Sequence, residues 1–133
     1  AIGAGLGVAV MFIDLDHFKD VNDAHGHHAG DAVLQIVAKR LRGCTRPTEM
    51  VTRYGGDEFV IVSTDPTADT LESLTGRVHG VLDHPIHVDG LLWQPAASIG
   101  LALSESGDGP ADVLRRADHE MYLVKQRRRR LPS

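Results

Sequence analysis

Four carboxylates stand at two points where the chain is expected to leave or enter a strand. Asp14 and Asp16 follow a short apolar run at residues 8–13, and Asp57 and Glu58 follow a pair of glycines. If the first strand lies beside the segment that carries the second pair, all four side chains crowd together. Like charges this close repel one another unless a cation neutralises them, and an all-oxygen ligand set suits Mg²⁺. The pattern therefore predicts a magnesium site, although each acid taken alone is more typical of a solvated turn.

The first elements that must position these acids follow from hydrophobic spacing. The run VAVMFI at residues 8–13 is typical of a central strand that is buried on both faces. Residues 17–27 are expected to form a turn. A helix should begin at residues 30–31, because apolar residues then recur at the i, i+3, i+4 and i+7 positions until Gly43 provides a stop.

A hairpin is predicted next, with strands over residues 50–54 and 57–63. The glycine pair between them, Gly55 and Gly56, is expected to form a two-residue turn, because glycine tolerates the positive φ angles that such a turn requires. Without side chains, the same glycines would let a phosphate group come close to the backbone.

The remaining predicted helices and strands complete the order of elements along the chain. A helix is predicted over residues 67–82, a small hairpin over 86–94, a core strand over 95–103, and a helix that starts at Pro110 and has one apolar face. The order predicts an α+β fold with a βαββαβ, ferredoxin-like antiparallel sheet, an extra small hairpin, and helices on one face of the sheet.

Length and composition are those of one folded domain: 133 residues, of which 42% are hydrophobic and 24% are charged. The single cysteine, Cys44, excludes an internal disulfide and a CxxC zinc site, and it fits a reducing cytoplasm. The longest apolar stretch is too short to cross a bilayer. Because the chain does not begin with Met, we expect it to be part of a longer protein.

The basic C-terminal segment, the few aromatic residues and the histidines do not predict a nucleic-acid-binding or zinc site. Residues 115–133 carry seven Lys and Arg against two Asp and Glu, which is typical of a solvated helix end and less often of contact with nucleic acid or acidic lipid. With only three Phe, two Tyr and one Trp, the chain lacks the stacking surface of RNA-binding sheets, so no nucleic-acid partner is expected. The histidines of residues 17–28 have no cysteine or spaced helical partner that would complete a zinc site.

Five sequence blocks, in order, resemble the GGDEF domain family of bacterial diguanylate cyclases. The central block is RYGGDEF at residues 53–59, and the others are DLDHFKDVND at 14–23, GHHAGD at 26–31, ASIG at 97–100 and RRADHEMYLVK at 115–125. The resemblance implies a nucleotidyl-cyclase palm-type fold. It also implies that a homodimer condenses two GTP molecules into cyclic di-GMP in the cytoplasm and releases two pyrophosphates.

The resemblance assigns a metal and catalytic role to five residues. It implies that two Mg²⁺ ions per active site, for which Mn²⁺ could substitute, are held by Asp14, the main-chain carbonyl of Leu15 and Asp57, with help from Glu58. Asp57 would also be the base for the attacking 3′-hydroxyl. Lys19 would face the phosphates and stabilise charge in the transition state.

Further positions match the nucleotide-binding residues of the family. The nucleoside positions correspond to Phe18, Asn22, His27 and Asp31. A carboxylate such as Asp31 can accept hydrogen bonds from the N1–H and N2–H groups of guanine, although Asp31 could instead cap the predicted helix. The phosphate-binding pair corresponds to Lys125 and Arg129, which a spacing of four residues would place on one face of a helix.

The chain departs from the family at two positions. Where many members carry an inhibitory RxxD site, this chain has Arg46, Pro47, Thr48 and Glu49, so product inhibition is expected to be weak or absent. Arg128 stands where the family usually has the glycine of a GRN motif.

The resemblance also bears on domain organisation. The family's leading helix, with its DxLTGLxNR segment, is not found here, so residues 1–133 are expected to be a GGDEF domain without that helix. A sensory domain upstream or a phosphodiesterase domain downstream is the expected neighbour. The alternative function is therefore a non-catalytic, GTP-binding GGDEF module that controls such an attached domain.

Overall fold

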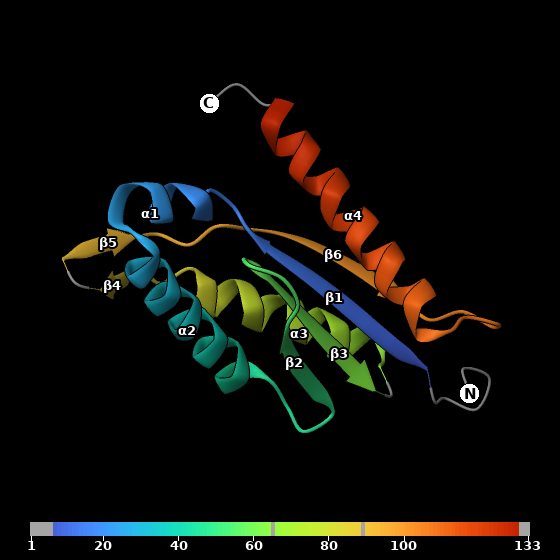
Figure 1. The fold of residues 1–133 in the computed structure, drawn as a ribbon. Coiled ribbons are helices and arrows are strands. Elements are labelled where there is room, and N and C mark those ends of the chain that lie inside the picture. Colours follow the sequence, from blue (N-terminus) through green and yellow to red (C-terminus); the bar gives the residue numbers. More distant parts are fainter. Residues whose placement is uncertain (1–6, 65, 89, 131–133) are drawn as a thin grey trace.

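A four-stranded antiparallel sheet forms the centre of the protein (Figure 1). The computed structural model describes residues 7–64, 66–88 and 90–130, with only the backbone of residues 129 and 130. The strands lie in the order β2-β3-β1-β6, with bounds β1 Val8–Leu15, β2 Glu49–Arg53, β3 Glu58–Thr64 and β6 Ala97–Leu103. This is the strand order of the ferredoxin-like βαββαβ unit, so the predicted fold class is confirmed.

Strand β1 is central and is buried on both faces, as its apolar sequence predicts. It pairs antiparallel with β3 on one side and with β6 on the other. Successive side chains of a strand point to opposite faces. Met11 and Ile13 accordingly belong to one hydrophobic core, and Val10 and Phe12 to a second core on the other face.

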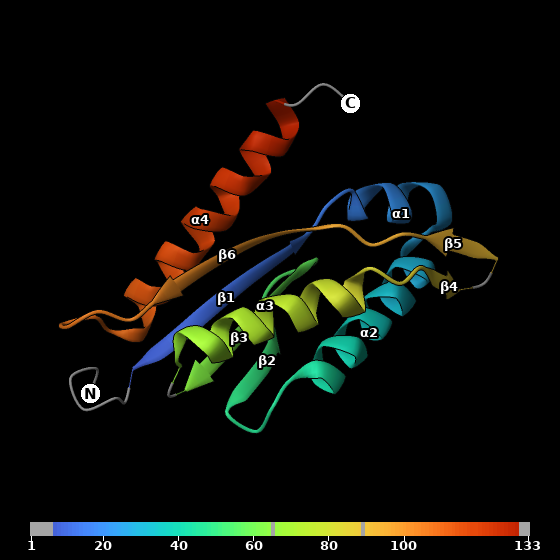
Figure 2. The same cartoon turned by 180° about the vertical axis from the view of Figure 1, so that it is seen from behind.

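Helices cover both faces of the sheet (Figures 1 and 2). Helices α2, His27–Cys44, and α3, Ala68–Leu82, contribute to the core that contains Met11, whereas α4, Pro110–Arg130, contributes to the core that contains Phe12. The prediction that all helices lie on one face is therefore wrong. A strand that is apolar on both sides must be covered on both sides, and α4 supplies the second cover.

The backbone of α4 lies almost directly on β6 at Gly100. A Cβ atom at this position would lie 2.2 Å from the carbonyl oxygen of Ala117 and 2.2 Å from the amide nitrogen of Met121. Both atoms belong to the helix backbone and cannot move aside. Gly100 therefore permits the close packing that fixes α4 against the sheet.

The segment predicted as a turn contains a helix, α1, over Phe18–His25. The chain enters α1 through His17, which has a φ of 60°, and passes into α2 at Gly26, with a φ of 87°. In α1 only Phe18 and Val21 are buried. Such a short element has too few apolar positions to give a helical period, which is why the sequence did not reveal it.

The loop between β2 and β3 is longer than predicted. It comprises residues 54–57, and the Tyr54 amide donates to the Glu58 carbonyl at 2.8 Å. Neither Gly55 nor Gly56 is among the glycines with positive φ. The prediction of a two-residue turn with positive φ is therefore wrong, because a four-residue loop can be closed without that conformation.

The other predicted elements are present, although α2 begins at His27, before the predicted start at residues 30–31, and runs past the predicted stop at Gly43. Helix α3 is capped by Thr67, whose side chain accepts from the Thr70 amide at 3.1 Å. Strands β4, Ile86–Val88, and β5, Leu91–Trp93, form the small hairpin. Within the described ranges, no helix has both the length and the apolar character required to cross a membrane.

Candidate functional site

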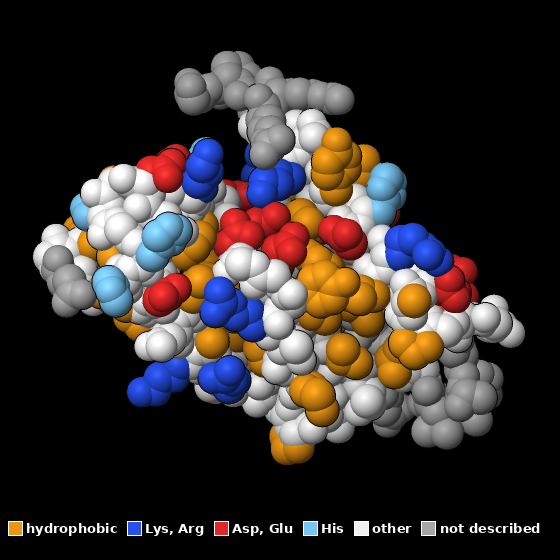
Figure 3. All heavy atoms as spheres, viewed as in Figure 1, with side chains coloured by type: hydrophobic (Ala, Val, Ile, Leu, Met, Phe, Trp, Pro, Cys, Tyr) orange, Lys and Arg blue, Asp and Glu red, His pale blue; other side chains and the backbone are white. Residues whose placement is uncertain are grey.

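The register of the sheet brings Asp14 beside the acidic pair Asp57 and Glu58. Asp14 lies directly opposite Glu58 in the β1–β3 ladder. The Leu15 amide donates to the main-chain carbonyl of Asp57 at 3.1 Å. Figure 3 shows acidic side chains gathered beyond the end of β1, with Lys and Arg side chains next to them. Three of the four predicted carboxylates therefore lie close together, and we call these three, Asp14, Asp57 and Glu58, the acidic cluster. The fourth, Asp16, is paired with Arg128 and Ser98 instead, so its predicted place among them is wrong.

Asp14 is buried and only partly neutralised. Its Oδ2 accepts from the Lys125 ammonium at 3.0 Å, whereas its Oδ1 has no hydrogen-bond partner among the described residues. Burial raises the pKa of the Asp14 carboxyl; the Lys125 hydrogen bond opposes this rise, and the nearby charges of Asp57 and Asp16 add to it. The fold thus holds a carboxylate whose negative charge is incompletely compensated.

Glu58 is half-buried and shares this environment. Burial raises the pKa of its carboxyl, and the charges of Asp14 and Asp57 raise it further. A Cβ atom on Gly55 would lie 2.5 Å from the Glu58 Oε1. The glycine therefore leaves room for the Glu58 carboxylate, which is a different reason for its presence from the predicted positive φ.

The acidic cluster fits a divalent cation that completes its coordination shell with other ligands. In the described part of the chain, no group of three or more His, Cys, Asp or Glu side chains is arranged to hold a metal by itself. The cluster nevertheless offers only oxygen donors, and one buried oxygen of Asp14 has no partner. Mg²⁺ commonly binds one or two carboxylates together with water and substrate phosphates, so the donor set suits it.

A pocket of about 310 Å³ opens beside the acidic cluster. Six of its lining residues were predicted as site residues: three lie on helix α1, two on helix α2, and one, which also belongs to the cluster, in the β2–β3 loop. These six residues, all predicted from the sequence, are Phe18, Lys19, Asn22, His27, Asp31 and Asp57. Asp57 thus joins the pocket to the acidic cluster.

Close packing of α1 on α2 determines where Asn22 lies. A Cβ atom at Gly30 would lie 1.8 Å from the Asn22 Oδ1 and 3.2 Å from the Phe18 ring. Phe18 also packs edge-on against Trp93, with ring centroids 6.3 Å apart. Gly30 therefore allows α1 to approach, and Trp93 supports it from the small hairpin.

Asp31 lies inside α2 and does not cap it. The N-cap position of α2 is Gly26, and the helix begins at His27. The alternative interpretation of Asp31 as a helix cap is therefore wrong. Its exposed carboxylate lines the pocket.

Two residues of the pocket were not predicted as site residues, Leu34 and Arg53, whereas Gly56 was expected there only as a glycine that lets a phosphate approach the backbone. The Arg53 guanidinium donates to the carbonyls of Gly55 at 3.2 Å and Gly56 at 3.1 Å, and so it holds the loop that carries Asp57. Its place two residues before the glycine pair was the available signal. Leu34 was predicted only as a core residue of α2.

The predicted phosphate-binding pair is not placed in this pocket. Lys125 lies on Asp14, as described above, and it is not among the pocket's lining residues. The side chain of Arg129 lies outside the described residues. The neighbouring Arg128 is paired with Asp16.

Comparison with known proteins identifies the family. The family model described as "Diguanylate cyclase, GGDEF domain" matches residues 4–131. The chain belongs to the GGDEF family. The diguanylate cyclase TpbB of Pseudomonas aeruginosa is 40% identical over 126 residues, which are 92% of this chain and 29% of TpbB.

Two further similarities extend this comparison. The cyclic di-GMP phosphodiesterase NbdA of Pseudomonas aeruginosa is 38% identical over 123 residues, which are 91% of this chain and 16% of NbdA. This GGDEF domain therefore spans less than a third of the length of either relative. The crystal structure of the GGDEF domain of TpbB superimposes with a TM-score of 0.85 at 38% identity, covering 96% of this chain and 81% of that one.

A larger cavity of the GGDEF domain, about 880 Å³, lies on the α4 side of the sheet. Its walls include the valines of β1 and β3, and it contains none of the predicted site residues. The smaller polar pocket is the candidate site because the charged and amide side chains converge there.

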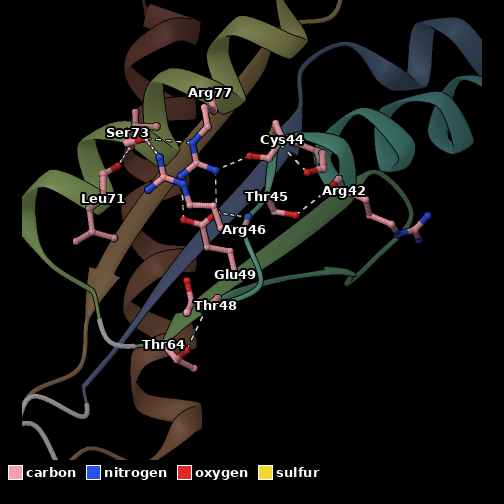
Figure 4. A network of polar contacts seen from close by, with 12 residues as sticks. Arg42, Cys44, Thr45, Arg46, Thr48, Glu49, Thr64, Leu71, Ser73 and Arg77 are labelled. Carbon is pink, nitrogen blue, oxygen red and sulfur yellow. Dashed lines mark hydrogen bonds and ion pairs between the residues drawn. The ribbon is translucent and has the colours of Figure 1, made fainter.

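The RxxE segment of the GGDEF domain lies in a separate polar network (Figure 4). Two nitrogens of Arg77 donate to the two oxygens of Glu49 at 2.8 and 2.9 Å, and the Arg46 amide donates to Glu49 at 2.8 Å. Arg77 also donates to the Cys44 carbonyl, and Arg46 to the Ser73 hydroxyl. The hydrogen bonds from Arg77 lower the pKa of Glu49. The Glu49 carboxylate is thus fully engaged within the domain.

Proposed function

We propose that this GGDEF domain is a diguanylate cyclase, which converts two GTP molecules into cyclic di-GMP and two pyrophosphates. One observation carries the proposal: Asp57 belongs both to the polar pocket and to the acidic cluster. A nucleotide in the pocket would therefore have its phosphates beside the carboxylates that fit a divalent cation.

Recognition of guanosine is assigned to the side chains from α1 and α2. Asp31 would accept from the N1–H and N2–H groups of guanine, and Asn22 would donate to its acceptors, a combination that adenine cannot satisfy. Phe18 supplies an apolar wall, and the exposed His27 lies in reach of the nucleoside. Gly30 leaves room for the Asn22 side chain between α1 and α2, so that Asn22 and Asp31 line the same pocket.

Phosphoryl chemistry is assigned to the loop and the acidic cluster. Asp57 would accept the proton of a 3′-hydroxyl, whose oxygen bonds to the α-phosphorus while the bond to the leaving pyrophosphate breaks. Lys19 would stabilise the phosphate charge from the pocket side. Asp14, Asp57, Glu58 and the Leu15 carbonyl would hold Mg²⁺, which when bound neutralises the charge that develops on the phosphate.

Two copies of the domain are needed for the product. Each copy has one such pocket and would bind one GTP, so two copies must face each other to form both phosphodiester bonds. GTP as substrate and a single free thiol, Cys44, are consistent with a cytoplasmic location.

A second candidate function is a GTP-binding module without catalysis. The similarity to the phosphodiesterase NbdA, of which this chain spans 16%, favours considering it. In that case the domain would bind GTP and regulate an attached domain. The acidic cluster argues for the cyclase, since binding alone does not require carboxylates gathered at the phosphate end.

Product formation separates the two functions. The protein is incubated with GTP and Mg²⁺ over a range of protein concentrations, and cyclic di-GMP is measured by chromatography, with GTP binding measured in parallel. We expect the parent to form product and Asp57→Ala to lose about 10²–10⁴-fold of the rate. Asp23→Ala removes an exposed carboxylate of α1 outside the pocket and should have no effect. GTP binding without product at any concentration, also in a protein that carries the family's leading helix upstream of residue 1, would establish the binding module instead.

A further inference from the structure

Asp16 belongs neither to the pocket nor to the acidic cluster, and its side chain is tied to β6. Its Oδ1 accepts from the fully buried Ser98 hydroxyl at 2.9 Å, and its amide donates to the Ala96 carbonyl at 2.8 Å. The side chain is only 12% exposed. A side-chain and a main-chain hydrogen bond therefore hold the Asp16 carboxylate against the β6 side of the sheet.

Arg128 reaches this carboxylate from the end of α4. Its Nη1 donates to the Asp16 Oδ2 at 2.5 Å. Lys125, one turn earlier on the same helix, donates to Asp14 at 3.0 Å. Among the residues described, these are the two ion pairs that join α4 to the last residues of β1 and the residue that follows the strand.

The end of α4 depends on these pairs because the core does not extend to it. Met121 is the last buried residue of the helix in the described chain. The following turns are half-buried or exposed, and helix ends without packing tend to fray. The ion pairs of Lys125 and Arg128 are the contacts that remain to hold these last turns of α4 in place.

The two ion pairs differ in how a cation bound at the acidic cluster would affect them. Asp14 belongs to the acidic cluster, so a cation bound there competes with Lys125 for its carboxylate. Asp16 faces Ser98 and Arg128 and keeps both partners. The Arg128–Asp16 pair would then be the remaining ion pair between α4 and the end of β1.

We propose that Arg128 is a positioning residue, which holds the end of α4 at Asp16 so that Lys125 stays beside the site after it has left Asp14. The proposal rests on the proposed function in one respect, namely that Lys125 then turns to a phosphate of GTP. An arginine at this position can span from the helix to the sheet, which the family's usual glycine cannot do.

The first test compares two neighbouring arginines. Arg128→Ala should weaken GTP binding in the presence of Mg²⁺ by about threefold to tenfold, the range typical of one partly exposed ion pair and its loss of positioning. Arg127→Ala removes the same charge from an exposed side chain that has no ion pair among the described residues, and it should bind GTP like the parent. Arg128→Lys should recover part of the affinity. Equal losses in the two alanine variants, or no loss in Arg128→Ala, would overturn the proposal.

The second test does not depend on GTP. Amide hydrogen exchange of the peptide over residues 121–128 should be at least about threefold faster in Arg128→Ala than in Arg127→Ala. Asp16→Asn keeps an acceptor for Ser98 but removes the charge, and adding Arg128→Ala to it should cause no further increase. Exchange that is the same in both arginine variants would refute the anchor, whereas an intact anchor in a protein that binds no GTP would refute only the proposed function.

Discussion

Glu49 and Asp14 are both buried acidic residues, with side chains that are 1% and 9% exposed, but they have opposite environments. Each residue is 6% exposed. Glu49 receives two hydrogen bonds from Arg77 and one from the Arg46 amide, and its pKa is lowered. Asp14 receives one hydrogen bond from Lys125, leaves one oxygen without a described partner, and has a raised pKa.

The comparison shows that the number and charge of its partners, and not burial alone, decide the state of a buried carboxylate. A fully paired carboxylate contributes to stability, whereas an incompletely paired one among other acids costs stability and has to be held by the surrounding fold. Incomplete pairing is typical of sites that bind or react, because a ligand can supply the missing partner. The network around Glu49 is therefore expected to serve stability, and the cluster around Asp14 to serve chemistry.

Breaking the Glu49 network should have the largest effect on stability. Arg77→Ala leaves a buried carboxylate without its cation, and we expect the free energy of unfolding to fall by about 2–4 kcal/mol, somewhat below the usual range because Arg77 is 23% exposed. Urea denaturation would measure it. Arg115→Ala, which removes an exposed ion pair, should cost less than about 0.5 kcal/mol. Similar losses in both variants would contradict the assignment of stability to this network.

The contribution of Glu49 to the free energy of unfolding should depend on pH, and replacing Glu49 should cost less than Arg77→Ala does. Because the pKa of Glu49 is lowered from its ordinary value of 4.5, its charged form stabilises the fold above that pH, and this contribution is lost as the pH falls through the lowered pKa. Glu49→Gln should be about 1–2 kcal/mol less stable than the parent at pH 7. The difference should shrink below pH 4.5. A constant difference across this range would show that charge is not the cause.

Neutralising Asp14 should affect stability least, and with the opposite sign. Because the pKa of Asp14 is raised, its charged form is disfavoured in the fold, so Asp14→Asn should leave stability at pH 7 unchanged or slightly higher. Product formation should nevertheless be lost, because a ligand of the proposed cation is removed. Thermal unfolding and the chromatographic assay measure the two effects. A clear loss of stability would mean that the Lys125 pair outweighs the repulsion.

The sequence predicted the site better than it predicted the elements that carry it. Six predicted residues line the pocket, and Asp14 meets Asp57 and Glu58 as expected, whereas Asp16 pairs with Arg128 instead. The helix that carries Phe18, Lys19 and Asn22 was missed, because eight residues with two buried positions give no period. The role of Arg53 in holding the glycine loop was also missed, since it depends on carbonyl directions that spacing does not specify.

The sequence by itself determined the family, the antiparallel sheet and the composition of the site, because the blocks are local and the apolar periods are strong. Tertiary structure decided three other features. It placed α4 against β6 through Gly100, it brought Lys125 and Arg128 onto the acids at the end of β1, and it paired Arg77 with Glu49. The partners in these ion pairs lie 28 to 112 residues apart in the chain, so their meeting depends on how whole elements pack and not on any local pattern.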